Sequence, residues 1–182
     1  MVLALAACGS DDGGDSPEAT AGASWAGDVC SAMTDLDASL KGLGQGLDVN
    51  VGSGDAVDQL KTQVGEQADK VEGDLQALAS AVSDVPTDVG DDISGEAADL
   101  EAQGDDLKAS VADVESAVAA VADADSASAF ATALTAATTA VQAALDDVAD
   151  YTSSLSTAAT SGADSVQAAF NDAPECAAYV SS

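Results

Sequence analysis

Histidine and arginine are absent from this 182-residue chain, and positive charge of any kind is scarce. Four lysines stand against 33 aspartates and glutamates, which gives a formal net charge of −29. A nucleic-acid-binding protein needs cations to replace the counterions of the phosphates, so the composition excludes that partner. Catalysis by an imidazole acid or base, and a guanidinium clamp on an anion, are excluded as well.

Aromatic residues make up only 3% of the chain, so typical strand formers are few. Apolar content still reaches 47%, and much of it is alanine and valine. Such a chain can form a packed core, although alanine buries little area and the core should be thin. Alanine is the best helix former and lets backbones approach closely. We therefore expect closely spaced helices, and the length suits one domain.

From Trp25 onward, apolar residues recur at steps of three and four, which is the spacing of one helical face. In the first helix Ser24 is the expected N-cap, and the glycines at 42, 44 and 46 are expected to end it. Three longer stripes and a short one follow, over residues 57–85, 89–121, 130–155 and 166–170.

Two boundaries between the long stripes are marked by residues that end or cap helices. Pro86 forbids continuation of the second helix, and Ser126 precedes the fourth. Short connections between long helices imply antiparallel neighbours. The prediction is an all-α fold: an antiparallel up-down helical bundle of about four helices, the first shorter than the rest, with a short C-terminal helical tail.

The N-terminus carries a targeting motif and is not expected to form part of the core. Its first eight residues read Met-Val-Leu-Ala-Leu-Ala-Ala-Cys, and a small, acidic, Gly-rich stretch follows. The segment Leu5-Ala6-Ala7-Cys8 resembles the lipobox of bacterial lipoproteins. That resemblance implies cleavage before Cys8 and attachment of a diacylglyceryl group to its thiol.

The predicted organisation follows from this motif: a residual signal peptide at 1–7, a flexible acidic tether at 8–23 and a helical bundle domain at 24–182. The basic region of a signal peptide is missing and the apolar run is short, so we expect the start codon to lie upstream of Met1 or the sequence to be truncated. The alternative is an incidental buried cysteine in a short apolar N-terminus. No later segment approaches 18 continuous apolar residues, so no transmembrane helix is predicted.

Cys30 and Cys176 remain once Cys8 is assigned to the anchor. An exported chain meets oxidising conditions, which favours a disulfide between them. In an up-down bundle the fourth helix returns to the end where the first began, and Cys176 follows that return. The alternatives are two separate buried thiols, or a metal site, which two thiolates without histidine leave incomplete.

Little else in the sequence points to chemistry. Each lysine follows an acid by one helical turn, which predicts surface ion pairs: Asp37–Lys41, Asp58–Lys61, Glu66–Lys70 and Asp105–Lys108. Paired aspartates do not match a calcium-binding loop and are expected on solvated helix faces. We predict no catalytic, cofactor-binding or metal-binding residues.

The few large aromatic residues gather near the two cysteines. Trp25, Phe170 and Tyr179 predict a small aromatic plug at that end, with a ligand pocket there as the alternative. Tyr151 stands alone on the fourth predicted helix, where it could line a groove or lie at the surface. Glycines at 65, 73, 95 and 104 fall inside predicted helices and mark either close helix contacts or kinks.

The whole chain resembles the small Ala/Asp-rich lipoproteins of high-GC Gram-positive bacteria, which often place a tryptophan and a cysteine early in the first helix and another cysteine near the end. Here these are Ser24-Trp25-Ala-Gly-Asp-Val-Cys30 and Pro174-Glu-Cys176. The resemblance implies no assigned activity.

We therefore expect an exported protein, anchored by Cys8 to the outer face of the cytoplasmic membrane, with a non-catalytic structural or protein-interaction role in the envelope. Its partners would be the membrane and an envelope protein. The alternative is an extracytoplasmic binding protein for a small apolar or cationic ligand between helices. The high acidity could also be an adaptation to salt.

Overall fold

The computed structural model describes residues 17–47, 54–87 and 90–180, and within these ranges it contains helices and no strands. The prediction of an all-α chain is confirmed. The elements are α1 (Pro17–Leu47), α2 (Gly54–Ser83), α3 (Gly90–Asp123), α4 (Ala127–Ser161), α5 (Asp164–Asp172), a 3₁₀ turn at Pro174–Cys176 and α6 (Ala177–Val180).

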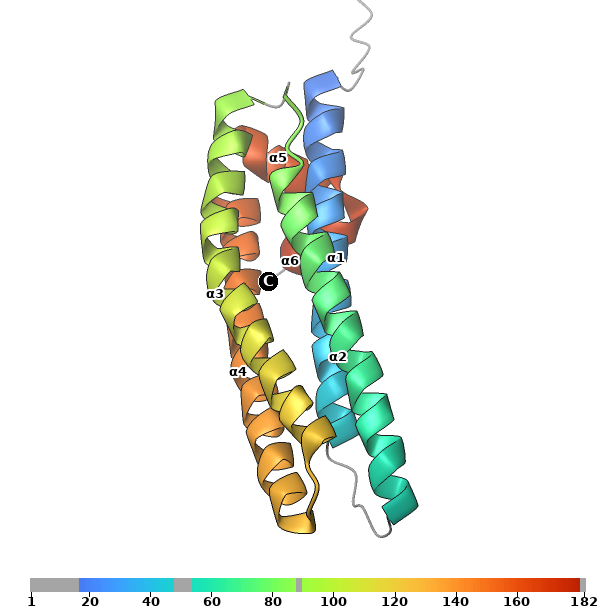
Figure 1. The fold of residues 1–182 in the computed structure, drawn as a ribbon. Coiled ribbons are helices and arrows are strands. Elements are labelled where there is room, and N and C mark those ends of the chain that lie inside the picture. The colour runs from blue at the N-terminus through green and yellow to red at the C-terminus, as the bar shows by residue number, and fades with distance from the viewer. Residues whose placement is uncertain (1–16, 48–53, 88–89, 181–182) are drawn as a thin grey trace, which may run out of the picture.

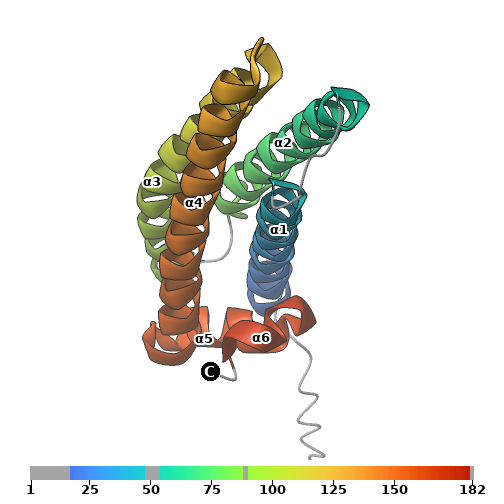
Figure 2. The same ribbon diagram turned by 90° about the horizontal axis from the view of Figure 1, so that it is seen from below.

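Four long helices pack side by side (Figure 1). Helix α1 contacts α2 and α4, while α3 contacts the same two helices. The short helices α5 and α6 lie across one end of the long ones (Figure 2). There α5 contacts α1, α3 and α4, so the C-terminal segment joins three of the four long helices.

Helix α1 differs from the prediction at both ends. It begins at Pro17, where a proline is favoured because its missing N–H has no helical partner, so the N-cap assigned to Ser24 is wrong. It also continues through the three glycines to Leu47. Leu43 and Leu47 are buried, and their packing outweighs a cost of about 1 kcal/mol for each helical glycine. The first helix is therefore comparable in length to the others.

The start of α1 also corrects the predicted tether at 8–23. Residues 17–23 are helical, and Ala21 packs against the core. Gly22 lies so close to α3 that a Cβ there would be 3.0 Å from the Cδ1 of Ile93. These residues therefore belong to the folded part of the chain, whereas Cys8 and the rest of the tether lie outside the described residues.

The other helix boundaries agree with their sequence signals. Helix α2 ends at Ser83, three residues before Pro86. Ser126 caps α4 as predicted: its backbone is extended, and its side chain accepts a hydrogen bond from the Ala129 N–H. These signals act locally, which is why the sequence alone located them.

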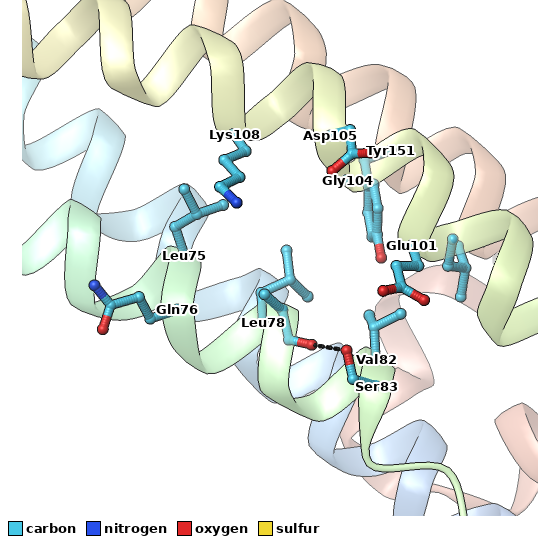
Figure 3. Close-up of a pocket in the computed structure, with 12 residues that line it drawn as sticks. Leu75, Gln76, Leu78, Val82, Ser83, Glu101, Gly104, Asp105, Lys108 and Tyr151 are labelled. Carbon is cyan, nitrogen blue, oxygen red and sulfur yellow. Dashed lines mark hydrogen bonds between the residues drawn. The ribbon is translucent and has the colours of Figure 1, made fainter.

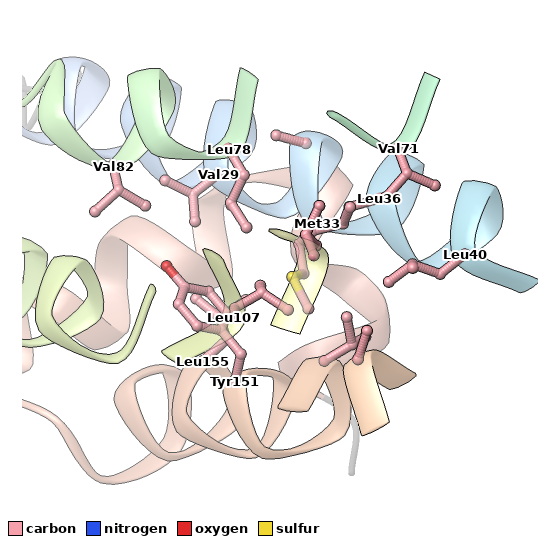
Figure 4. Packing of buried hydrophobic residues seen from close by; sticks show 14 of the residues in the cluster. Val29, Met33, Leu36, Leu40, Val71, Leu78, Val82, Leu107, Tyr151 and Leu155 are labelled. Atoms are coloured by element: carbon pink, nitrogen blue, oxygen red, sulfur yellow. The ribbon is translucent and has the colours of Figure 1, made fainter. Parts of the chain in front are cut away.

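One continuous core runs between the long helices and is built mostly from valine, leucine and alanine. Helix α3 shows its regularity, because its buried residues recur at alternating steps of four and three, as in coiled coils: Leu107, Val111, Val114, Val118 and Val121. Side chains from α1, α2, α3 and α4 meet in this core (Figure 4).

Polar contacts join neighbouring helices at a few points. The Ser39 hydroxyl donates to Asp74 between α1 and α2, and the Ser110 hydroxyl donates to Asp147 between α3 and α4. Lys70 extends the first contact, since its ammonium donates to Ser39 at 2.5 Å and pairs with Asp74 at 2.8 Å. Each serine–aspartate bond fixes one pair of helices that follow each other in the chain.

The lysines only partly follow the predicted pairing. Lys41 pairs with Asp37 at 2.6 Å, as expected, but Lys70 pairs with Asp74 rather than Glu66. Lys61 donates to the carbonyl oxygens of Ala122 and Ala124, at 2.9 and 2.7 Å. Those carbonyls lie at the C-terminal end of α3, where a cation compensates the helix dipole.

Among the described residues one helix, α4, is long and apolar enough to cross a membrane, judged by length and composition alone. A core helix of a soluble protein passes the same test. Helix α4 contributes Val141, Val148 and Leu155 to the core. This finding is therefore weak support for a membrane span.

Two glycines of α2 offer a test of helix propensity without packing effects. A Cβ built at Gly65 or Gly73 meets nothing within 4 Å, so neither residue marks a close helix contact. We predict that Gly73→Ala raises the free energy of unfolding by about 1 kcal/mol, measured by urea denaturation. At Gly162 a Cβ would lie 2.5 Å from the Ala158 oxygen, so Gly162→Ala should destabilise the protein. A loss of stability in Gly73→Ala would contradict this interpretation.

Candidate functional site

The two cysteines predicted to pair are at disulfide distance, and this prediction is confirmed. The Cys30 and Cys176 sulfurs are 2.04 Å apart, and both residues are fully buried. Cys30 lies on α1 and Cys176 in the 3₁₀ turn that follows α5. The bond therefore ties the first long helix to the C-terminal segment across 146 positions of sequence.

The predicted aromatic plug is present beside the disulfide. Trp25 and Phe170 meet edge to face, with ring centroids 5.9 Å apart and planes at 75°. Tyr179 is buried nearby, its hydroxyl shares a hydrogen bond of 3.2 Å with Thr34, and its carbonyl accepts from Ser156. These aromatic side chains are buried and form part of the core at this end.

Opening the disulfide tests how much it stabilises the fold. A cross-link over 146 positions restricts the unfolded chain by at most about 5 kcal/mol in the chain-entropy model. We predict that a Cys30→Ser/Cys176→Ser variant loses several kcal/mol, up to about that figure, in urea denaturation. Non-reducing mass analysis of the exported chain should show the loss of both thiol hydrogens. Two free thiols in exported material would contradict the pairing.

A pocket of about 230 Å³ lies between α2 and α3 (Figure 3). Its walls are apolar side chains of the two helices, its rim carries charged groups, and one residue of α4 reaches it from the core. The lining residues are Leu75, Gln76, Leu78, Ala79, Val82, Ser83, Leu100, Glu101, Gly104, Asp105, Lys108 and Tyr151.

Gly104 is the smallest residue that lines the pocket. Gly104 of α3 lies over the Tyr151 ring, and even a Cβ at this position would come within 4.0 Å of the ring carbon Cε2. A longer side chain would cover the ring and occupy the pocket. The sequence alone left the purpose of this glycine undecided between a helix contact and a kink. The structure shows that it leaves room beside Tyr151.

Tyr151 is the most unusual group in the pocket. The residue is 3% exposed, and its hydroxyl has no hydrogen-bond partner among the described residues. Burial raises the pKa of Tyr151 well above the ordinary value of a tyrosine, so the phenol is neutral at physiological pH. A buried hydroxyl without a partner costs about 1–3 kcal/mol, and it can both donate to and accept from a ligand.

Charged side chains at the pocket rim also lack ionic partners. Glu101, Asp105 and Lys108 are exposed on α3, and none of them takes part in the two ion pairs of the described residues. The predicted Asp105–Lys108 pair is therefore wrong. In Figure 3 the side chains of Lys108 and Glu101 are drawn on opposite sides of the pocket. The rim thus has a cationic side and an acidic side.

The remaining acidic groups form no metal centre in the described part of the chain. No cluster of three or more histidine, cysteine, aspartate or glutamate residues there is placed to hold a metal ion. The pKa of Glu96 is raised, first by burial and then by the Asp99 carboxylate, but Glu96 does not line the pocket.

Comparison of the chain with protein-family models, with curated proteins and with solved structures gives no match. The site is therefore interpreted from its own geometry.

Replacing Tyr151 by phenylalanine tests the cost of its hydroxyl. We predict that Tyr151→Phe raises the free energy of unfolding at pH 7 by about 1 kcal/mol, because it removes a buried group without a partner. Tyr179→Phe is the matched control and should lower stability, since the Tyr179 hydroxyl is bonded to Thr34.

The same variant should change the response to alkaline pH. The pKa of Tyr151 is higher in the folded than in the unfolded chain. Its contribution to the free energy of unfolding is therefore present below about pH 10 and is lost as the pH rises further. Tyr151→Phe should reduce the fall in stability between pH 9 and 11, measured by urea denaturation. An equal fall in both proteins would show that the phenol is not buried.

Proposed function

We propose that the chain is an exported lipoprotein, held at the outer face of the cytoplasmic membrane by lipidated Cys8, with a non-catalytic role in the bacterial envelope. The observation that carries this proposal is the buried Cys30–Cys176 pair at disulfide distance. Disulfides persist in oxidising compartments outside the cytosol. The lipobox-like Leu5-Ala6-Ala7-Cys8 supports the same location independently.

The folded part is proposed to be an antiparallel up-down bundle. Its support is the cyclic order of contacts, in which each long helix packs against the one that follows it and α4 packs against α1. The two serine–aspartate bonds, which join α1 to α2 and α3 to α4, support it as well. Such a bundle would display an acidic surface that anionic lipids repel.

A role without catalysis is supported by the available side chains. The chain has no histidine, and the Ser83 hydroxyl in the pocket already donates to the Ala79 carbonyl. No serine or threonine of the pocket is paired there with a base that could activate it. Interaction with an envelope protein is the function that these features favour.

Lipid anchoring is tested by substitution of the modified cysteine. We predict that the protein, expressed from its own gene in its own cells, sediments with membranes and is released by detergent but not by high salt. The Cys8→Ala form should appear in the medium, because the folded part lacks any other anchor in this proposal. Ser10→Ala, two positions further on, is the matched control and should stay with the membranes. An unanchored wild-type protein would refute the proposal.

A second candidate function is binding of a small ligand between helices. The specific observation in its favour is the pocket between α2 and α3, with the buried, unpartnered Tyr151 hydroxyl at its inner end. Its volume of about 230 Å³ lies below the ~300–1,000 Å³ of sites for drug-sized ligands. The ligand would therefore be small, and the protein would act as an extracytoplasmic binding protein.

A further inference from the structure

We propose that the pocket between α2 and α3 binds a small organic cation: an ammonium group attached to one apolar ring or a short alkyl chain. The ammonium would lie between the Tyr151 hydroxyl and the carboxylates of Glu101 and Asp105. This inference rests on the second proposed function, binding between helices, and specifies the class of ligand.

The walls of the pocket determine the apolar part of the ligand. Leu75, Leu78 and Val82 of α2 line the pocket together with Leu100 of α3. These side chains offer no hydrogen bonds, so hydrocarbon gains from contact with them while a polar group loses its hydration. A volume of about 230 Å³ admits a ligand with a single ring.

The hydroxyl of Tyr151 supplies the polar contact at the inner end. Its side chain comes from α4, passes under Gly104 and points toward α2 (Figures 3 and 4). The phenol is neutral and has no partner among the described residues, so its oxygen keeps the capacity to accept a hydrogen bond from an ammonium. The oxygen exposes less than 1 Å² to solvent, so the side chains that cover it must move aside when the ligand binds. Formation of that bond would remove the cost of the unsatisfied group.

The charge at the rim selects a cation over an anion. Glu101 and Asp105 place two carboxylates at the mouth, against one ammonium from Lys108. The side chains of Glu101 and Lys108 are drawn on opposite sides of the pocket (Figure 3). A ligand ammonium bound near Glu101 therefore avoids Lys108. The net charge of −29 also raises the local concentration of cations and lowers that of anions.

The test uses three probes of nearly the same shape: benzylammonium, benzyl alcohol and benzoate. Binding is measured by calorimetry and by ligand-observed NMR at 150 mM NaCl, where non-specific attraction is screened. The protein is the full oxidised chain with Cys8→Ala, so that a single disulfide is kept. We expect saturable binding of benzylammonium, about tenfold weaker binding of benzyl alcohol, and no binding of benzoate.

Charge-matched variants separate the rim from the general field of the protein. Glu101→Gln/Asp105→Asn removes two exposed carboxylates at the mouth. Asp113→Asn/Glu115→Gln removes one exposed and one half-buried carboxylate of the same helix outside the pocket. We expect the first pair to weaken benzylammonium binding about three- to tenfold and the second pair to leave it unchanged. An equal effect of both pairs would overturn the proposal, because the attraction would then be non-specific.

Two further variants test the interior of the pocket. Tyr151→Phe should weaken benzylammonium binding about fivefold, because it removes the acceptor and keeps the ring. Gly104→Leu should abolish binding by filling the space, with circular dichroism as the check on folding. If Gly104→Leu does not fold, the effect of Tyr151→Phe on benzylammonium binding decides whether the proposal stands.

The outcomes distinguish the class of ligand from the pocket itself. If benzyl alcohol binds as tightly as benzylammonium and Tyr151→Phe alters both, the cation class is wrong while binding between helices stands. If benzoate binds best, Lys108 selects the ligand and the proposal is overturned. If none of the probes binds in a saturable manner, both the cation class and the second proposed function fail.

Discussion

Burial of narrow apolar stripes between four long helices is the interaction on which the rest of this structure depends. The chain carries a net charge of −29 and few aromatic residues, so repulsion at its surface is opposed mainly by valine, leucine and alanine packed in the interior. A stripe of valines such as that of α3 contributes only a moderate area per residue, and stability must therefore come from its length. This explains why the long helices each exceed eight turns, and why the cross-links matter: the disulfide fixes α1 to the C-terminal turn, and Lys61 joins α2 to the end of α3.

The parts of the fold that the sequence predicted are those governed by local signals or by strict periodicity. The cap at Ser126 and the stop before Pro86 act within one turn, and both are present. The pairing of Cys30 with Cys176 was predicted because an up-down bundle would return its last long helix to the start of the first. The two sulfurs are at disulfide distance. The extent of α1 was mispredicted, because local propensity at its three late glycines is outweighed by the burial of Leu43 and Leu47 against other helices. Such tertiary compensation is not encoded in the segment where it acts.

The pocket could not be predicted for a different physical reason: it depends on the side chain that a glycine lacks. Gly104 gives no apolar signal and lies four positions after Leu100, on the side of α3 toward α2 and Tyr151. Only the arrangement of three helices shows that the space above the Tyr151 ring is left open. Both residues reduce stability, one through the entropy of a helical glycine and the other through an unpartnered buried hydroxyl.

Helix α4 connects the pocket to the C-terminal segment that carries Cys176. Tyr151 lies on α4, and one turn later Leu155 enters the core while Ser156 donates to the Tyr179 carbonyl of α6. Helix α6 directly follows the turn that contains Cys176, which the disulfide attaches to α1. The covalent bond therefore ties the C-terminal segment to α1, and the Ser156 hydrogen bond ties the same segment to α4, the helix that carries Tyr151. A shift of α4 by one residue would move Tyr151 by about 1.5 Å along the axis and turn it by about 100° out of the space beside Gly104. The disulfide and the pocket are in this way linked through the C-terminal segment and α4.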